Sequence, residues 1–269
     1  MIDSSPVLVL LGMHRSGTSL TANWLHHCGL HLGDRLLTHD ESNPTGHYED
    51  IDFLQLHKDI LEDNKTDYTY AGETPLQLSA YHRARAKAMV TYKHQLHHQW
   101  GWKEPRTCLF IELYQELLPQ AKYIVLVRHP DKVINSLMQR DWTRIRLSLR
   151  DHPLKRWYKS YLLIKNRKVR ALRYAKAWKY YNEQLLTLVK ALPEEGYFLG
   201  TTDDVKEHSA SIFQRLTAFG FKLENYPISS VLIKRPPLPK ENWVLPDALN
   251  QELKELYTSL LEFRSIHQV

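Results

Sequence analysis

Near the N-terminus the chain reads VLVLLGMHRSGTSL over residues 7–20. Five consecutive apolar residues are typical of a strand that is buried on both faces, as strands of parallel sheets are. The turn that follows is bracketed by Gly12 and Gly17, and a helical pattern begins at Thr18. Such a turn points backbone N–H groups inward, and the dipole of the following helix adds positive potential. We therefore predict an anion-binding loop in an α/β fold, with Arg15 as a permanent charge at its tip.

This loop differs from the loop of ATP- and GTP-binding proteins, whose pattern is GxxxxGK[ST]. Gly12 and Gly17 keep the separation, but Thr18 stands at the lysine position and the basic residue is Arg15. The second clear strand ends in Arg128, where metal-dependent enzymes often carry an aspartate that holds Mg²⁺. Positive charge on the protein rather than on a metal suits a phosphosulfate. We expect no metal in this site, and a P-loop kinase-like phosphoryl transferase remains the alternative.

A second motif is YIVLVRHPDKVINSL, residues 123–137. Arg128 follows a predicted buried strand, at the end where ligands bind in open α/β sheets. Ser136 comes eight residues later, in the helix that begins after Pro130. A guanidinium fork and a hydroxyl that face the same crevice form a phosphate clamp.

Together the two segments resemble the sulfotransferase family that uses 3′-phosphoadenosine 5′-phosphosulfate (PAPS). GMHRSGTS, residues 12–19, is similar to the family's 5′-phosphosulfate loop, and VRHP with Ser136 is similar to its 3′-phosphate motif. GWKEPR, residues 101–106, resembles the short lysine-containing segment between them. By motif the resemblance covers residues 7–137. The arginine in the loop and the NPTGHYE segment of residues 43–49 are typical of bacterial and carbohydrate-type members.

The resemblance implies a P-loop NTPase-like sulfotransferase fold, PAPS as co-substrate and no metal. Arg15 would bond the bridging oxygen and the sulfuryl oxygens as charge moves to the leaving phosphate, and Lys103 would contact the sulfuryl group. The residues implied in donor binding are His14, Arg15, Ser16, Gly17, Thr18, Ser19, Arg128 and Ser136. The family's basic loop near the C-terminus is not found here, and Lys234 and Arg235 are candidate substitutes.

The acceptor hydroxyl must lose a proton during transfer, and a positioned carboxylate or histidine can take it. Our first candidate for this catalytic base is Glu49, because related loop-borne glutamates line the acceptor side and a helical stretch follows at Asp50. Glu104 is the second candidate, although it can instead pair with Arg106. His47 and His14 are weaker candidates.

The rest of the chain alternates strand and helix patterns. Further strands are predicted at 100–103, 121–127 and 196–200, and helices at 17–28, 50–62, 77–98, 171–192, 208–219 and 246–263. This alternation predicts a central parallel sheet flanked by helices on both faces. With no internal repeat and no clear linker, residues 1–269 are expected to form a single sulfotransferase domain.

Basic residues concentrate between Arg140 and Lys179, where fourteen Lys or Arg stand against Asp141 and Asp151. A field of this sign attracts anions. A solvated helix face, an anionic substrate and a membrane surface are the interpretations that remain open. Nucleic acid is not expected, since no nucleic-acid motif accompanies the charge.

The remaining composition is that of an ordinary globular protein. Two cysteines in 269 residues make a disulfide framework improbable. No apolar run approaches the roughly 20 residues that span a bilayer, and the first run is too short for a signal peptide. We expect a cytoplasmic enzyme. Its acceptor would be a sugar, lipid or other alcohol, and the sequence leaves the acceptor and the oligomeric state open.

Overall fold

The computed structural model describes residues 5–37, 46–233, 239 and 241–266. Its centre is a four-stranded sheet in the order β2-β1-β3-β4, and every neighbouring pair is parallel. The strands are β1 (Val7–Leu11), β2 (Trp100–Lys103), β3 (Lys122–Leu126) and β4 (Tyr197–Gly200). The predicted fold class, a parallel sheet flanked by helices, is confirmed.

The strand register brings both sequence motifs to one edge of the sheet. Leu10 of β1 pairs with Lys103 of β2 on one side and with Ile124 of β3 on the other. Because parallel strands end at the same edge, the loop after β1, the end of β2 and the turn after β3 are neighbours. Gly101 permits the close approach of β2, since a Cβ there would lie 2.2 Å from the carbonyl oxygen of Leu8.

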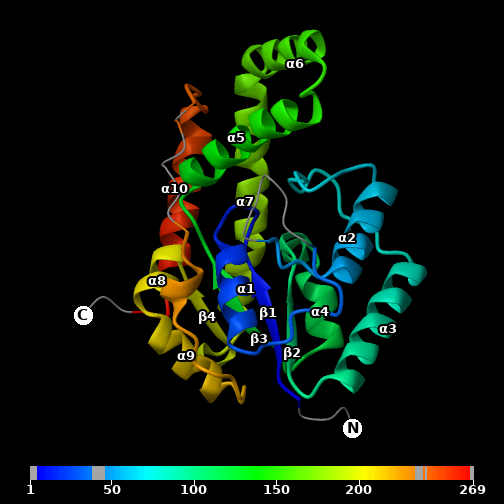
Figure 1. Cartoon of the computed structure of the whole chain (residues 1–269), viewed down its shortest axis with the longest axis vertical. Coiled ribbons are helices and arrows are strands. Elements are labelled where there is room, and N and C mark those ends of the chain that lie inside the picture. Colours follow the sequence, from blue (N-terminus) through cyan, green and yellow to red (C-terminus); the bar gives the residue numbers. More distant parts are fainter. Residues whose placement is uncertain (1–4, 38–45, 234–238, 240, 267–269) are drawn as a thin grey trace.

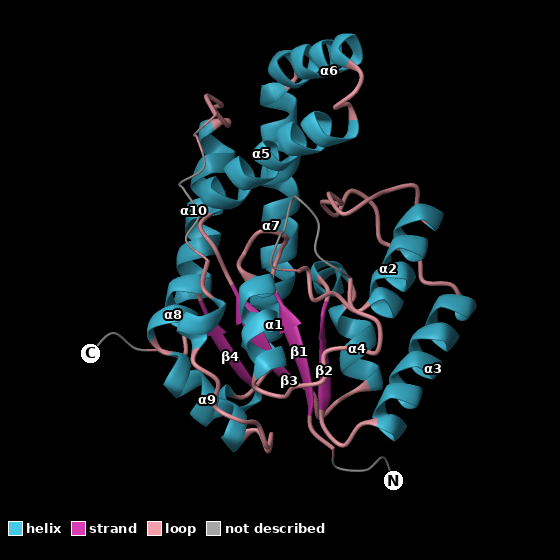
Figure 2. Ribbon diagram, in the orientation of Figure 1, coloured by secondary structure: helices cyan, strands magenta, loops and turns pink. Residues whose placement is uncertain are grey.

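Helices cover both faces of this sheet (Figure 1 and Figure 2). The helices of the described chain are α1 (Thr18–His27), α2 (Ile51–Asp63), α3 (Ala80–Leu96), α4 (Ile111–Leu117), α5 (Pro130–Ser148), α6 (Pro153–Lys165), α7 (Arg167–Ala191), α8 (Thr202–Glu207), α9 (Ser209–Ala218) and α10 (Asp247–Leu261). Three short 3₁₀ turns are η1 (Pro105–Leu109), η2 (Glu194–Gly196) and η3 (Ile228–Val231).

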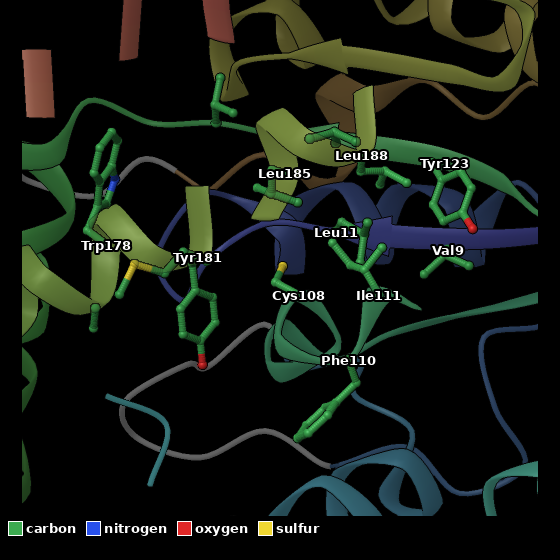
Figure 3. Packing of buried hydrophobic residues seen from close by; sticks show 14 of the residues in the cluster. Val9, Leu11, Cys108, Phe110, Ile111, Tyr123, Trp178, Tyr181, Leu185 and Leu188 are labelled. Carbon is green, nitrogen blue, oxygen red and sulfur yellow. The ribbon is translucent and has the colours of Figure 1, made fainter. Parts of the chain in front are cut away.

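The hydrophobic core has one layer on each face of the sheet. Successive residues of a strand point to opposite faces, so Leu8 and Leu10 pack with α1 and α9, while Val9 and Leu11 pack with α7 and α4. Figure 3 shows the second layer, in which side chains of α7 such as Leu185 meet those of the strands. A strand buried on both faces must be apolar throughout, which explains the continuous runs in the sequence.

Most predicted elements are present, and the differences lie in the helices. The helix after Pro130 continues to Ser148, and the next helix, α6, has no buried residue and was not predicted. The short helices α4 and α8 were also not predicted. The turn at residues 43–45 and the two basic residues at 234 and 235 lie outside the described residues.

Two further findings concern cysteines and membranes. Cys28 and Cys108 are both buried as free thiols, as packing residues would be. In the described part of the chain, no helix combines the length and the apolar character that crossing a bilayer requires.

Candidate functional site

The loop between β1 and α1 has a backbone that few sequences can adopt. Arg15 has a φ of 73° and Gly17 a φ of 95°, both in the left-handed region. A Cβ at Gly17 would lie 2.2 Å from Oγ1 of Thr202, so only glycine fits there. The turn ends at the first residue of α1, Thr18, whose helix carries no acidic residue in its first turn. The free N–H groups of this helix end are therefore available to an anion.

The second motif holds this loop in place. Nη1 of Arg128 donates a hydrogen bond to the carbonyl oxygen of Arg15 at 2.8 Å, and Nε of Arg15 donates to Oγ of Ser136 at 2.9 Å. Oγ1 of Thr202 donates to the carbonyl oxygen of Ser16 at 3.0 Å. The indole of Trp178 in turn donates to the carbonyl oxygen of Arg128 at 3.1 Å. The structure thus brings the predicted phosphate residues of the two motifs together.

Two cavities lie beside the loop, and they share Gly17, Arg128 and Lys206. We call them together the loop groove. The first, of about 240 Å³, lies over the N-terminus of α1 and reaches Ile233; the second, of about 440 Å³, extends towards α8 and α10. Burial lowers the pKa of Arg128, but an arginine stays protonated at neutral pH. The loop groove therefore offers positive charge and helix-end donors to an anionic ligand.

A third cavity, of about 850 Å³, lies on the other side of Arg15, and we call it the Glu49 cavity. Arg15, Thr18 and Ser19 line both this cavity and the loop groove, so the two meet at the start of α1. Its cationic lining residues are Arg15, Lys58, Arg106, Arg140 and Arg144, and Glu49 is the one carboxylate among its described lining residues.

Lys103 and Glu49 meet where the cavities join. Nζ of Lys103 lies 3.0 Å from Oε1 of Glu49 and 3.4 Å from Oγ of Ser19. The Lys103 side chain is completely buried, whereas that of Glu49 keeps 10% of its surface and faces the cavity. A carboxylate beside an ammonium group at the mouth of an anion-binding loop can accept a proton from a group that enters the cavity.

The position of Glu49 is fixed by its neighbours in sequence. Its carbonyl oxygen accepts a hydrogen bond from the N–H of Leu37 at 2.7 Å. The next residue, Asp50, is fully buried, caps α2 through the N–H of Asp52 and forms an ion pair with Lys93 of α3 at 2.8 Å. The helix cap is therefore Asp50, and Glu49 is left to face the cavity.

Glu104 lies in a different environment. Its side chain is completely buried, forms an ion pair with Arg106 and lies 2.6 Å from Nδ1 of His57. The other nitrogen of His57 lies 2.7 Å from the hydroxyl of Tyr114. Burial opposes ionisation of Glu104, but Arg106 and His57 outweigh it and lower the pKa of this carboxyl. This network stabilises the turn after β2. Glu104 does not line the Glu49 cavity.

His14 lines the Glu49 cavity as well. Burial lowers the pKa of His14 well below its usual value, and the charges of Arg106 and Arg140 act in the same direction. His14 is therefore a neutral imidazole at pH 7. Its Nε2 atom has no hydrogen-bond partner among the described residues. His14 thus lies on the cavity side of the loop rather than in the loop groove.

The sequence analysis did not predict several residues that line the loop groove and the Glu49 cavity. Thr202 and Lys206 come from α8, which follows β4, and the capping pattern of Thr201 and Asp204 could have located that helix. Arg140 and Arg144 belong to the basic segment, and their spacing of four residues places them on one side of α5. The segment is therefore divided between a cavity and the protein surface.

One cluster of metal-ligand side chains occurs among the described residues, outside both cavities. Nε2 of His31 and Nε2 of His97 lie 3.2 Å and 2.9 Å from the same carboxylate oxygen of Asp34. The other oxygen of Asp34 pairs with Nζ of Lys93 at 2.8 Å. This lysine offsets the negative charge that a metal ion would need, and the cluster shares no residue with the loop.

Comparison with known proteins gives a consistent result. Residues 6–185 match the model of a family described as the sulfotransferase family. No curated protein sequence matches the chain.

Among solved structures, the chain is similar to the sulfotransferase domain of the olefin synthase from Synechococcus PCC 7002, with 16% identity, a TM-score of 0.53 and 94% of both chains covered. It is similar to the sulfotransferase domain of the curacin biosynthetic pathway, with 15% identity, a TM-score of 0.51, and 95% of this chain and 97% of that chain covered. It is also similar to sulfotransferase STF9 from Mycobacterium avium, with 14% identity, a TM-score of 0.54, and 98% of this chain and 77% of that chain covered. At these identities the likeness shows a shared fold.

Neutralisation of the buried Glu104 should destabilise the fold. Glu104→Gln leaves the buried Arg106 without its counter-charge, so we expect a loss of about 3 kcal/mol or more in the free energy of unfolding. Because the folded state lowers the pKa of Glu104, its contribution is present above about pH 4.3, the ordinary glutamate value, and is lost as the pH falls further. Denaturant titrations at pH 7 and pH 3 measure both effects.

Glu62→Gln is the matched control, and it should cost little stability at pH 7 because Glu62 at the end of α2 is exposed to solvent. The variant Glu104→Gln should also lose less stability between pH 7 and pH 3 than the unmodified protein. Equal stability of the two variants would contradict the structural role of Glu104.

Proposed function

The chain belongs to the sulfotransferase family, and we propose that it transfers a sulfuryl group from PAPS to a hydroxyl-type acceptor, such as a sugar, lipid or other alcohol. The observation that carries this proposal is the position of Lys103 beside the loop, where its Nζ lies 3.0 Å from Oε1 of Glu49 and 3.4 Å from Oγ of Ser19. There a basic side chain and a carboxylate lie together at the start of α1, between the loop groove and the Glu49 cavity.

The loop groove is our proposed donor site. The N–H groups of the α1 end and the guanidinium of Arg15 suit the 5′-phosphosulfate. Arg128 and Ser136 suit the 3′-phosphate, as the family resemblance implies, and Arg128 faces both cavities of the groove. In the structure Ser136 is buried and bonded to Arg15, so the binding of a phosphate to Ser136 would require Arg15 to turn towards the donor.

The Glu49 cavity is our proposed acceptor site. The acceptor oxygen forms a bond to sulfur while the bond between sulfur and the bridging phosphate oxygen breaks, and 3′-phosphoadenosine 5′-phosphate leaves. Glu49 takes the proton of the acceptor hydroxyl. Arg15 and Lys103 supply positive charge where the leaving phosphate gains negative charge.

We further propose that the acceptor is anionic. Five cationic side chains line the Glu49 cavity against the single carboxylate of Glu49, and Lys103 is already paired with that carboxylate. Arg140 lies 4.8 Å from the ring centre of Tyr68, in a cation–π contact. Its Nε and Nη2 atoms have no hydrogen-bond partner among the described residues.

The first test of the donor site compares two nucleotides. 3′-Phosphoadenosine 5′-phosphate should bind more tightly than AMP, because each charge-assisted hydrogen bond contributes about 1.5–3 kcal/mol. Arg128→Ala should remove most of this preference, since that side chain would bind a phosphate that does not react. Calorimetry measures both affinities, and equal affinity of the unmodified protein for the two nucleotides would exclude the proposed donor. Lys190→Ala, which removes an exposed cation outside the loop groove and the Glu49 cavity, is the control.

The second test is a screen for acceptors with labelled PAPS in excess EDTA. Sugars, lipids and phenols that carry a carboxylate, phosphate or sulfate should accept label faster than their neutral analogues. Arg144→Ala should narrow this difference and change the KM for the acceptor more than that for PAPS. Turnover that stops in EDTA and returns with Mg²⁺ would favour the kinase-like alternative, and a preference for neutral acceptors would contradict an anionic one.

The third test concerns the catalytic base. Glu49→Gln preserves the shape of the side chain and removes its basicity, so the rate of transfer should fall about 100-fold or more while nucleotide affinity stays unchanged. Single-turnover measurement of label transfer separates this effect from product release. A near-normal rate would assign the proton instead to His14, the neutral imidazole in the same cavity, and His14→Phe would then be the variant to measure.

A further inference from the structure

An arm of the molecule projects away from the sheet, and the helix at its tip lines neither the loop groove nor the Glu49 cavity. It consists of the end of α5, the whole of α6 and the start of α7, and α6 forms the tip of the molecule along its longest axis (Figure 1). None of the thirteen residues of α6 is buried. A helix with no buried side chain gains little stability from packing, so packing in the core does not explain which residues α6 contains.

The outer side of α6 is apolar and aromatic. Leu154 is 83% exposed, Trp157 70% and Ile164 56%, and Tyr158 and Tyr161 are also exposed. At 100° per residue these five side chains fall on one side of the helix, and the partly buried Leu163 falls on the opposite side. The rings of Trp157 and Tyr161 stack with their centres 6.2 Å apart, which makes the exposed surface continuous.

Cations occupy most of the remaining surface of α6. At 100° per residue Lys155 and Lys159 lie beyond one border of the apolar side, Arg156 lies opposite it, and Lys165 falls within it. The exposed Lys and Arg residues of α6 and the start of α7 are Lys155, Arg156, Lys159, Lys165, Arg167 and Lys168. Between residues 142 and 182 the only carboxylate in the sequence is Asp151. The surface is therefore strongly positive as well as apolar, and it is not neutralised by its own side chains.

We propose that this arm binds the surface of an anionic lipid bilayer, with α6 lying in the interface. Interfacial helices carry Trp and aliphatic residues on one side and are rich in Lys and Arg on their polar surface, as α6 is. Trp and Tyr prefer the level of the lipid headgroups, and each nearby cation adds attraction to anionic lipid. Because α6 is at the tip, a flat surface can reach it without meeting the rest of the fold.

Charge and apolar character favour a bilayer over two other binding partners, a second copy of the chain and an acidic protein. A second copy of the chain would bring its own six cations against these six, which repel one another. An acidic protein would match the charge, but charge alone does not explain five exposed apolar side chains on a single helix side. A bilayer satisfies both features, since its headgroups are anionic and its acyl region accepts the rings.

The arm is also continuous with the proposed acceptor site, a link that rests on the proposed function. Arg144, Leu147 and Ser148 of α5 line the Glu49 cavity, and the chain enters α6 five residues after Ser148. Binding of the arm to lipid would hold that cavity next to the membrane surface. Vesicle binding itself needs neither PAPS nor turnover, so it is measured separately from the transfer reaction.

The experiment is co-sedimentation of the full chain with vesicles of phosphatidylcholine alone and with 30% phosphatidylglycerol. We expect binding to the anionic vesicles only, and less of it at 1 M salt, where screening shortens to about 3 Å. Lys155→Ala with Lys159→Ala should weaken binding about 25-fold, at roughly fivefold per cation. Leu154→Ser with Trp157→Ser should weaken it about tenfold or more.

The matched control is Tyr81→Ser with Lys87→Ala on α3, which removes an exposed aromatic residue and an exposed cation elsewhere and should leave binding unchanged. Trp157 is the one exposed tryptophan among the described residues, so fluorescence should shift to the blue on binding. Trp157→Phe should abolish that shift and preserve binding.

Three results would overturn the proposal. The first is equal binding, or no binding, to the two kinds of vesicle. The second is a dimer in light scattering that becomes a monomer when Leu154 and Trp157 are replaced, which would make this side a subunit interface. The third is binding of soluble polyglutamate as tight as that of anionic vesicles and insensitive to the same two substitutions, which would show that the arm recognises acidic chains.

Discussion

The central feature of this structure is a cluster of positively charged side chains around the loop between β1 and α1. Arg15, Lys103, Arg106 and Arg128 all approach the start of α1, where the helix dipole is positive as well. Two unit charges of like sign 4 Å apart repel by about 4 kcal/mol near a protein surface. Glu49 offsets Lys103 and Glu104 offsets Arg106, but Arg128 donates to a carbonyl oxygen rather than to a carboxylate. An anionic ligand in the loop groove therefore relieves a repulsion that the fold itself maintains.

The pairing of these charges follows from strand geometry. Lys103 ends β2 and Glu104 follows it, and successive residues of extended chain point to opposite sides. Lys103 therefore turns towards the loop and Glu104 towards His57 and Arg106. Because of this alternation, Glu104 points into the buried network and Lys103 points towards the loop. Lys103 there pairs with Glu49, a residue of a distant loop that lines the Glu49 cavity.

The sequence predicted those elements whose position in the fold allows only a few residue types. A strand buried on both faces must be apolar, so β1 and β3 were predictable, and so was the loop at Gly12 and Gly17. The contact of Glu104 with His57 was not predictable, because the two residues lie 47 positions apart and only the packing of α2 brings them together. The helix α6 was also missed, since its apolar residues face outward and give no signal of a core.

The helix α5 shows how one element connects these regions. Ser136, Arg140, Arg144 and Leu147 are spaced by four, four and three residues and therefore share one side of the helix. The first accepts a hydrogen bond from the loop, and the others line the Glu49 cavity. On another side, Trp142 and Arg146 line a groove of about 580 Å³ with Arg156 and Trp157 of α6. A rotation of α5 would therefore move the loop, the cavity and the arm together, because the same rigid helix carries residues of all three.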